Sequence, residues 1–171
     1  MLAVIIKLYG LMIKARKFAG TMTMPNQTSA TVHVARHFEF SAERVFDAWL
    51  DPKKAGRWLF STPTGQMVRV EIDARVGGGF VFIDRRNGED IEHKGEYLEL
   101  DRPKRLVFKF VVPKYSPLYS RVTIDIVPAG AGCSLTLVHE GVLPEYKAQT
   151  QSGWTGILEG LAANLAPVPR A

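Results

Sequence analysis

Apolar and polar residues alternate along most of the chain after residue 30, a pattern typical of β-strands with one buried face. The alternation occurs in seven stretches: residues 31–38, 68–72, 80–82, 93–97, 105–110, 121–126 and 134–139. In the second stretch, Val68, Val70 and Ile72 are expected to share one face. The dipeptide Asn87-Gly88 is typical of a tight hairpin turn. Together these stretches predict an antiparallel sheet with one covered and one solvent-exposed face.

Two short helices are predicted after the first strand. Ser41 can cap the first helix, and Glu43 in its first turn complements the helix dipole. Apolar residues then follow at helical spacing: Val45, Phe46, Trp49 and Leu50. Asp51-Pro52 ends this helix and can begin a second one, with Asp as its cap and Pro at its first position. Trp58 and Phe60 are expected to close the helical pair.

A long helix is predicted at the C-terminal end, between Pro144 and Pro167. Its apolar stripe consists of Trp154, Leu158, Leu161 and Leu165. Gly153, Gly156 and Gly160 lie on a neighbouring face, and each costs about 1 kcal/mol against Ala inside a helix. We expect these glycines to let the helix approach the sheet closely. The fold class is therefore α+β: a helix-grip, in which a curved antiparallel sheet of about seven strands wraps around this helix.

Composition supports one globular domain and excludes several classes of protein. The chain has 171 residues, of which 46% are hydrophobic and 23% charged, so disorder is excluded as its main state. The sequence has no run of 18 apolar residues, so we expect no membrane span. A single cysteine, Cys133, excludes an intramolecular disulfide and a multi-cysteine zinc site, and it indicates a reducing, cytoplasmic setting.

Residues 1–24 differ from the rest of the chain. They hold four basic residues and no acidic one, so they account for most of the net charge of +5. The rest of the chain carries only what is left of this net charge, so it lacks the basic face that nucleic-acid binding needs. Residues 1–24 could form a short amphipathic helix on a membrane surface, or the chain could start at Met22 or Met24. We therefore divide the chain into an N-terminal extension and linker, 1–30, and a domain, 31–166.

Several segments resemble the START-like (SRPBCC) superfamily, the fold of polyketide cyclases and pollen allergens. They are ARHFEFSAERVFDAWLDP at 35–52, RW at 57–58, EIDARVGGGFVF at 71–82, GEYLELDRPKRLVFKF at 95–110, LTLVHEG at 135–141 and GWTGILEGLAANL at 153–165. Within this superfamily the chain is similar to bacterial proteins like the activator of heat-shock protein 90 ATPase. The resemblance implies a cavity between the sheet and the C-terminal helix, which often holds an apolar or amphipathic molecule.

The alternation pattern places a set of aromatic and histidine side chains on the inner face of the sheet and helix. The predicted cavity lining is Trp58, Phe80, Phe82, His93, Tyr97, Phe108, Phe110, His139, Trp154 and Leu158. His93 and His139 could form the polar end of a pocket, where they would orient a ligand or act as acid or base. Because no carboxylate–histidine spacing picks out a base, the sequence favours the alternative, structural histidines that hydrogen-bond to backbone or water.

Other kinds of chemistry find no support in the sequence. Two histidines and one cysteine do not supply the ligands of a metal site. The glycines at 77–79 precede a strand and lack the Lys-Ser/Thr ending of a phosphate-binding loop. Cys133 has no obvious activating base. We therefore assign no catalytic residue, no metal and no cofactor.

The resemblance implies three possible functions. The first is binding of a small hydrophobic or aromatic ligand in the cavity. The second is a cyclase-like or hydratase-like enzyme that uses His93, Tyr97 or His139. The third is an interaction module that contacts a chaperone and stimulates its ATPase. The expected partners are a small hydrophobic molecule, and under the third function a chaperone; the protein is expected to be a monomer or homodimer.

Overall fold

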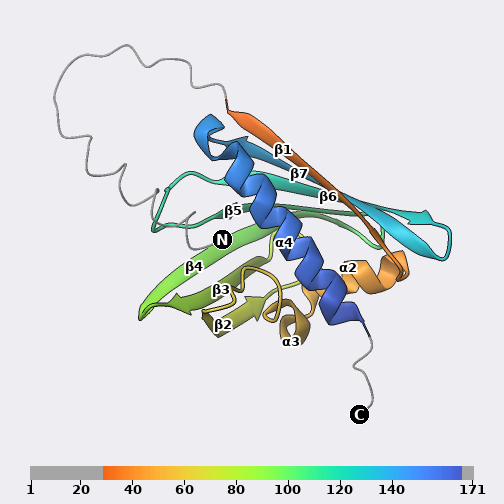
Figure 1. Cartoon of the computed structure of the whole chain (residues 1–171), viewed down its shortest axis with the longest axis horizontal. Helices are drawn as coiled ribbons and strands as arrows, with labels where there is room; N and C mark the ends of the chain where they lie inside the picture. Colours follow the sequence, from red (N-terminus) through yellow and green to blue (C-terminus); the bar gives the residue numbers. More distant parts are fainter. Residues whose placement is uncertain (1–28, 167–171) are drawn as a thin grey trace.

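The computed structural model describes residues 29–166 (Figure 1), so the interpretations of residues 1–24 lie outside the described part of the chain. The strands are β1 (Ala30–Phe38), β2 (Gln66–Ile72), β3 (Gly79–Arg86), β4 (Glu89–Asp101), β5 (Arg105–Val111), β6 (Ser120–Ala129) and β7 (Gly132–Val142). The helices are α2 (Ala42–Leu50), α3 (Pro52–Ala55), the 3-10 turn η2 (Pro144–Tyr146) and α4 (Lys147–Leu165).

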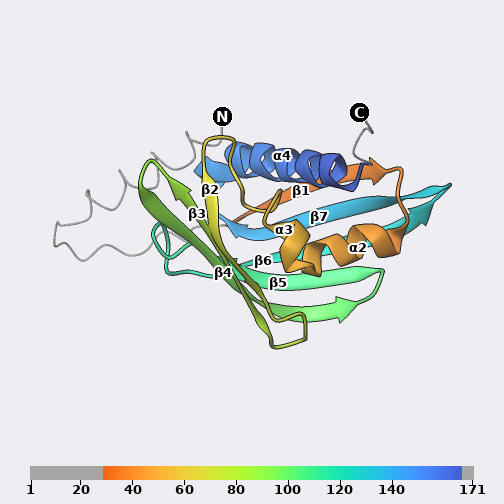
Figure 2. The same ribbon diagram turned by 90° about the horizontal axis from the view of Figure 1, so that it is seen from below.

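All seven strands form one antiparallel sheet in the order β1-β7-β6-β5-β4-β3-β2. The sheet bends around α4, and α2 and α3 lie near the C-terminal end of that helix (Figure 2). There Arg44 of α2 donates a hydrogen bond to the carbonyl of Leu165. Trp154, Leu158, Leu161 and Leu165 of α4 are buried, as the predicted apolar stripe requires. The predicted helix-grip is therefore confirmed. Within residues 29–166, no helix is both long and apolar enough to cross a membrane.

The predicted helix cap and hairpin signals operate as expected. The Ser41 side chain accepts a hydrogen bond from the backbone N–H of Arg44, 3.3 Å away, at the start of α2. Asp51 likewise accepts from Lys53 N–H at 3.0 Å and begins α3. At the β3–β4 hairpin, Asn87-Gly88 has φ values of 51° and 81°, the left-handed pair that this turn needs.

The predicted face of β2 is wrong in part. A β-bulge between Met67 and Arg69 shifts the register of this strand against β3. Because a bulge adds one residue, it reverses the alternation of inward and outward side chains. Val68 therefore points outward and is 38% exposed, while Met67 packs against the core beside Val70.

The role predicted for the α4 glycines is wrong for Gly156 and Gly160. A Cβ atom at Gly160 would lie 3.3 Å from Cβ of Trp58, so this glycine allows close approach of the segment after α3 rather than of the sheet. A Cβ atom at Gly156 would meet nothing within 4 Å. Gly156 is exposed and Gly160 half-buried, whereas the apolar stripe of α4 is buried.

Candidate functional site

Nine of the ten residues predicted to line the interior lie together between the sheet and α4: Phe80, Phe82, His93, Tyr97, Phe108, Phe110, His139, Trp154 and Leu158. All are buried except Phe110, which is half-buried. Trp58 is also buried, but its ring packs edge-on against Trp49 of α2, with ring centres 4.8 Å apart. Trp58 therefore belongs to the part of the core next to α2 and α3.

The rings under α4 form one continuous aromatic cluster. Phe80 of β3 packs against Tyr97 and Phe108, with ring centres 5.5 and 5.4 Å apart. Phe110 of β5 continues the cluster to Trp154 of α4, at 6.2 Å. These spacings are those of favourable edge-to-face aromatic pairs. Alternate positions of β3, β4 and β5 thus build an apolar interior, as the sequence predicted.

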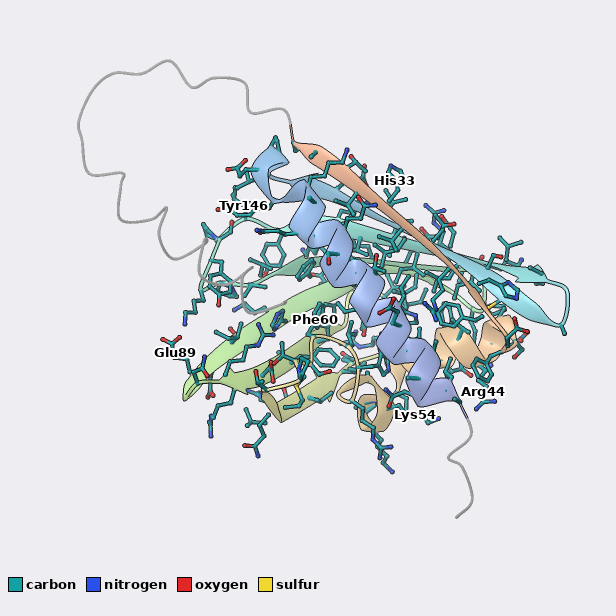
Figure 3. The ribbon with its side chains drawn as sticks, viewed as in Figure 1. His33, Arg44, Lys54, Phe60, Glu89 and Tyr146 are labelled. Atoms are coloured by element: carbon teal, nitrogen blue, oxygen red, sulfur yellow. The ribbon has the colours of Figure 1, made fainter. Side chains whose placement is uncertain are left out.

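Phe60 lies at the centre of this cluster, a position that its place in the sequence did not predict (Figure 3). Its ring stacks on His93 at 4.6 Å with an interplanar angle of 11°, and on Phe110 at 5.6 Å and 24°. Its edge-to-face neighbours are Phe82 at 5.5 Å and Trp154 at 6.1 Å. Only 5% of Phe60 is exposed to solvent. The predicted place of Trp58 and Phe60 at the end of a helical pair is wrong for both, because α3 ends at Ala55.

The backbone of Phe60 is strained. Its φ angle is 57°, in the left-handed region that bulky side chains rarely adopt. A conformation of this kind costs about 1–3 kcal/mol and persists only where the surroundings impose it. Nothing in the local sequence signals it, since glycine or asparagine would be the usual residue at such a position.

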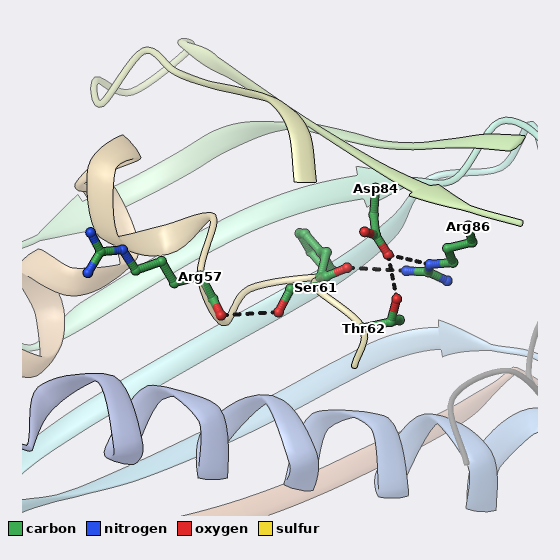
Figure 4. A network of polar contacts seen from close by, with 6 residues as sticks. Arg57, Ser61, Thr62, Asp84 and Arg86 are labelled. Atoms are coloured by element: carbon green, nitrogen blue, oxygen red, sulfur yellow. Dashed lines mark hydrogen bonds and ion pairs between the residues drawn. The ribbon is translucent and has the colours of Figure 1, made fainter. Parts of the chain in front are cut away.

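A buried polar network holds the segment that follows Phe60 (Figure 4). Asp84 of β3, only 1% exposed, accepts hydrogen bonds from Thr62 Oγ1 at 2.8 Å and from Arg86 Nε. Arg86 also donates from Nη2 to the carbonyl of Phe60 at 3.2 Å. A Cβ atom at Gly65 would collide with the Asp84 carboxylate. The alternation of β3 carried a signal for Asp84, because it shares the inward face with Phe80 and Phe82.

The two interior histidines are held in the neutral form. Burial, and secondarily the charge of Arg86, lowers the pKa of His93 from 6.5 to about 3. Burial alone lowers the pKa of His139 to about 4. His139 Nδ1 accepts a hydrogen bond from Trp154 Nε1 at 3.0 Å, which ties β7 to α4. Among the described residues, His93 Nδ1 and His139 Nε2 are buried without a hydrogen-bond partner.

Tyr97 and Cys133 are poorly suited to acid–base or nucleophilic chemistry. Burial raises the pKa of the Tyr97 hydroxyl and of the Cys133 thiol, so both stay protonated at neutral pH. No group of three or more His, Cys, Asp or Glu side chains within residues 29–166 could hold a metal ion. What the interior offers a molecule is therefore aromatic surface and two neutral imidazoles.

A groove of about 1090 Å³ lies outside this interior. Parts of segment 57–63 form one wall, and residues of α4 between 148 and 160 form the other, including Gly156 and Gly160. Of the predicted lining residues it contains only Trp58. Ser61, Thr62 and Pro63 line the groove, while Phe60 in the same segment points into the aromatic cluster. This segment thus separates the groove from the interior.

The chain is similar to known proteins over nearly all of its described length. Residues 39–166 match the family model described as activator of Hsp90 ATPase homolog 1-like protein. The crystal structure of protein CV1439 from Chromobacterium violaceum shares 30% sequence identity, with a TM-score of 0.73, over 85% of this chain and 100% of that one. Protein Mll3558 from Rhizobium loti shares 25%, with a TM-score of 0.67, over 80% and 96%.

A more distant structure has the same fold. Protein SA2116 from Staphylococcus aureus, a protein of unknown function, shares 16% sequence identity, with a TM-score of 0.73, over 82% of this chain and 95% of that one. No curated protein matches the sequence.

Proposed function

This chain belongs to the family of proteins like activator of Hsp90 ATPase homolog 1, and on that premise we propose that it binds a small apolar or aromatic molecule between the sheet and α4. One observation supports this role most directly: an aromatic cluster encloses two neutral histidines, each with a buried nitrogen that lacks a partner among the described residues. Ligand sites are commonly apolar and aromatic, with a few polar groups that orient the ligand. This interior has that composition.

The state of the histidines favours binding over acid–base catalysis. A general acid or base works best when its pKa lies near the working pH. The pKa of His93, about 3, and that of His139, about 4, are both far below neutrality. At pH 7 neither imidazole is in the protonated imidazolium form that acts as a general acid, and both are weak bases. Their suitable role is to donate or accept a hydrogen bond.

Nuclear magnetic resonance of the tryptophan indole N–H groups tests this function. The apolar dye anilinonaphthalene sulfonate serves as the probe, with the full chain as the protein. We expect a saturable shift of the Trp154 signal, because its indole contacts Phe110 and hydrogen-bonds to His139. Trp49, which packs against Trp58 near α2, provides an internal control and should shift little. A Trp154→Phe variant assigns the signal.

Dye that binds without moving the Trp154 signal would place the binding surface elsewhere and contradict the proposal.

Removal of either histidine gives a second test. If the protein binds a ligand, His93→Ala or His139→Ala should weaken affinity by about 1 kcal/mol, the value of one neutral hydrogen bond. If it is a cyclase-like or hydratase-like enzyme, the loss of its acid or base should slow turnover by about a hundredfold or more.

The description of the family supports one other role, contact with a chaperone. That role would use the surface of the protein rather than its interior. Adding the purified protein to the Hsp90 of its own cell and measuring ATP hydrolysis tests it. Stimulation that persists in the Trp154→Phe and histidine variants would favour this surface role over the ligand-binding one.

A further inference from the structure

The ring of Phe60 occupies a slot shaped for one flat ring. His93, Phe110 and, further away, Phe80 lie nearly parallel to it, with interplanar angles of 11°, 24° and 22°. Phe82 and Trp154 close the sides edge-on, at 75° and 62°. The neighbours thus come from β3, β4, β5 and α4, whereas Phe60 itself comes from the segment that joins α3 to β2. The slot is therefore built by the sheet and helix, and Phe60 is its occupant.

Phe60 occupies the slot imperfectly. Its φ angle of 57° is unfavourable for a bulky residue, so withdrawal from the slot would relieve strain in the backbone. The ring also has no polar atom to offer His93 Nδ1 or His139 Nε2, which are buried without partners among the described residues. His139 belongs to the same cluster, because its ring contacts Phe110 at 5.3 Å and Trp154 at 5.9 Å.

Withdrawal of Phe60 also has room to occur. The next residues, Ser61, Thr62 and Pro63, line the groove of about 1090 Å³ beside α4. Movement of this segment outward therefore enters open space instead of packed core. Thr62 donates a hydrogen bond to Asp84, and Arg86 donates one to the Phe60 carbonyl; these two bonds hold the segment in place when the slot has no other occupant.

From these observations we propose that the natural ligand is a planar aromatic molecule with a hydroxyl or similar hydrogen-bonding substituent, and that it binds by replacing the Phe60 ring where that ring stacks on His93 and Phe110. The proposal rests on the proposed binding function and specifies its ligand class. The ligand ring stacks as Phe60 does, and its polar substituent pairs with His93 Nδ1 or His139 Nε2. Phe60 acts as an internal competitor that every ligand must displace.

Phenol and toluene, which are similar in shape, are the probes for the test. The variant Phe60→Gly empties the slot and suits the left-handed backbone. If the open form of the wild-type protein is populated to about 10% or less, its apparent affinity is reduced about tenfold or more. We therefore expect Phe60→Gly to bind phenol at least about tenfold more tightly than wild type in calorimetric titration, and to prefer phenol to toluene by about fivefold.

The variant Phe38→Ala is the matched control, since Phe38 is equally buried but lies at the end of β1 next to α2. It should not gain affinity for phenol. Equal gains in both variants, no gain in Phe60→Gly, or equal binding of phenol and toluene by Phe60→Gly would overturn the proposal.

Wild-type protein provides a second measurement that does not depend on how the variants fold. At saturating phenol, we expect nuclear Overhauser contacts between phenol and His93, and loss of the contacts between Phe60 and His93. Retention of the Phe60–His93 contacts in the bound protein would refute displacement. If Phe60→Gly binds phenol while wild type responds to neither phenol nor the dye, the slot is real but the proposed function fails. If the dye shifts Trp154 and Phe60→Gly gains nothing, the function stands and the ligand class is wrong.

Discussion

Replacing Asp84 by Ala should destabilise the protein strongly, because this carboxylate is the centre of a buried network. Asp84 is 1% exposed, and its ion-pair partner Arg86 has 11% of its side chain exposed. The same carboxylate oxygen accepts from Thr62 Oγ1, and Arg86 in turn donates to the carbonyl of Phe60. The substitution leaves a buried guanidinium without its counter-charge and a threonine hydroxyl without its acceptor.

The expected loss follows from what is left unpaired. Breaking a buried ion pair by removing one partner typically costs about 3–5 kcal/mol. The native carboxylate is itself incompletely satisfied, because Asp84 Oδ1 has no hydrogen-bond partner among the described residues. This reduces the value of the native network, so we expect the lower end, about 3 kcal/mol. Asp84→Asn keeps the shape and one acceptor, and should cost roughly half as much.

Urea denaturation followed by circular dichroism measures the free energy of unfolding. Glu71→Gln is the control, because its pair with Arg69 is exposed on both sides and its loss should change the free energy of unfolding little. The double variant Asp84→Ala with Arg86→Met should recover part of the loss, since it removes the stranded charge. A loss below about 1 kcal/mol for Asp84→Ala, or no recovery in the double variant, would show that the network does not hold this part of the fold.

Two further predictions concern pH and helix stability. Because burial lowers the pKa of His93 to about 3 and of His139 to about 4, the unfolded chain gains protons below about pH 6.5 while the folded chain does not. Stability should thus be complete above pH 6.5 and fall by up to about 1.4 kcal/mol per pH unit for each histidine on acidification. Urea midpoints between pH 7 and 5.5 should show a smaller slope in His139→Gln than in the wild-type protein, and an equal slope would contradict this expectation. Gly156→Ala should stabilise the protein by about 0.5–1 kcal/mol, since the new methyl group meets open space. Gly160→Ala should stabilise it less, because its methyl group would lie against Trp58. Equal shifts in melting temperature for the two variants would contradict this expectation.

The aromatic interior could be predicted from the sequence, since strand alternation alone assigns its side chains to one face. His93 and Tyr97 on β4, for example, are two of the residues that period-two alternation places inward, and both are buried. The same rule failed at Val68, where one extra residue in β2 reversed the faces. A bulge of this kind depends on pairing with the neighbouring strand, so local alternation does not reveal it.

The sequence by itself determined the order of elements, the caps at Ser41 and Asp51 and the hairpin at Asn87-Gly88, because these depend on interactions among residues close together in the chain. Only the tertiary structure decided that Phe60 fills the interior and that Asp84 holds its segment. Both depend on contacts between segments more than 20 residues apart, and the left-handed backbone of Phe60 runs against its own local preference. Long-range packing can impose such a conformation, whereas the local propensity of the sequence does not predict it.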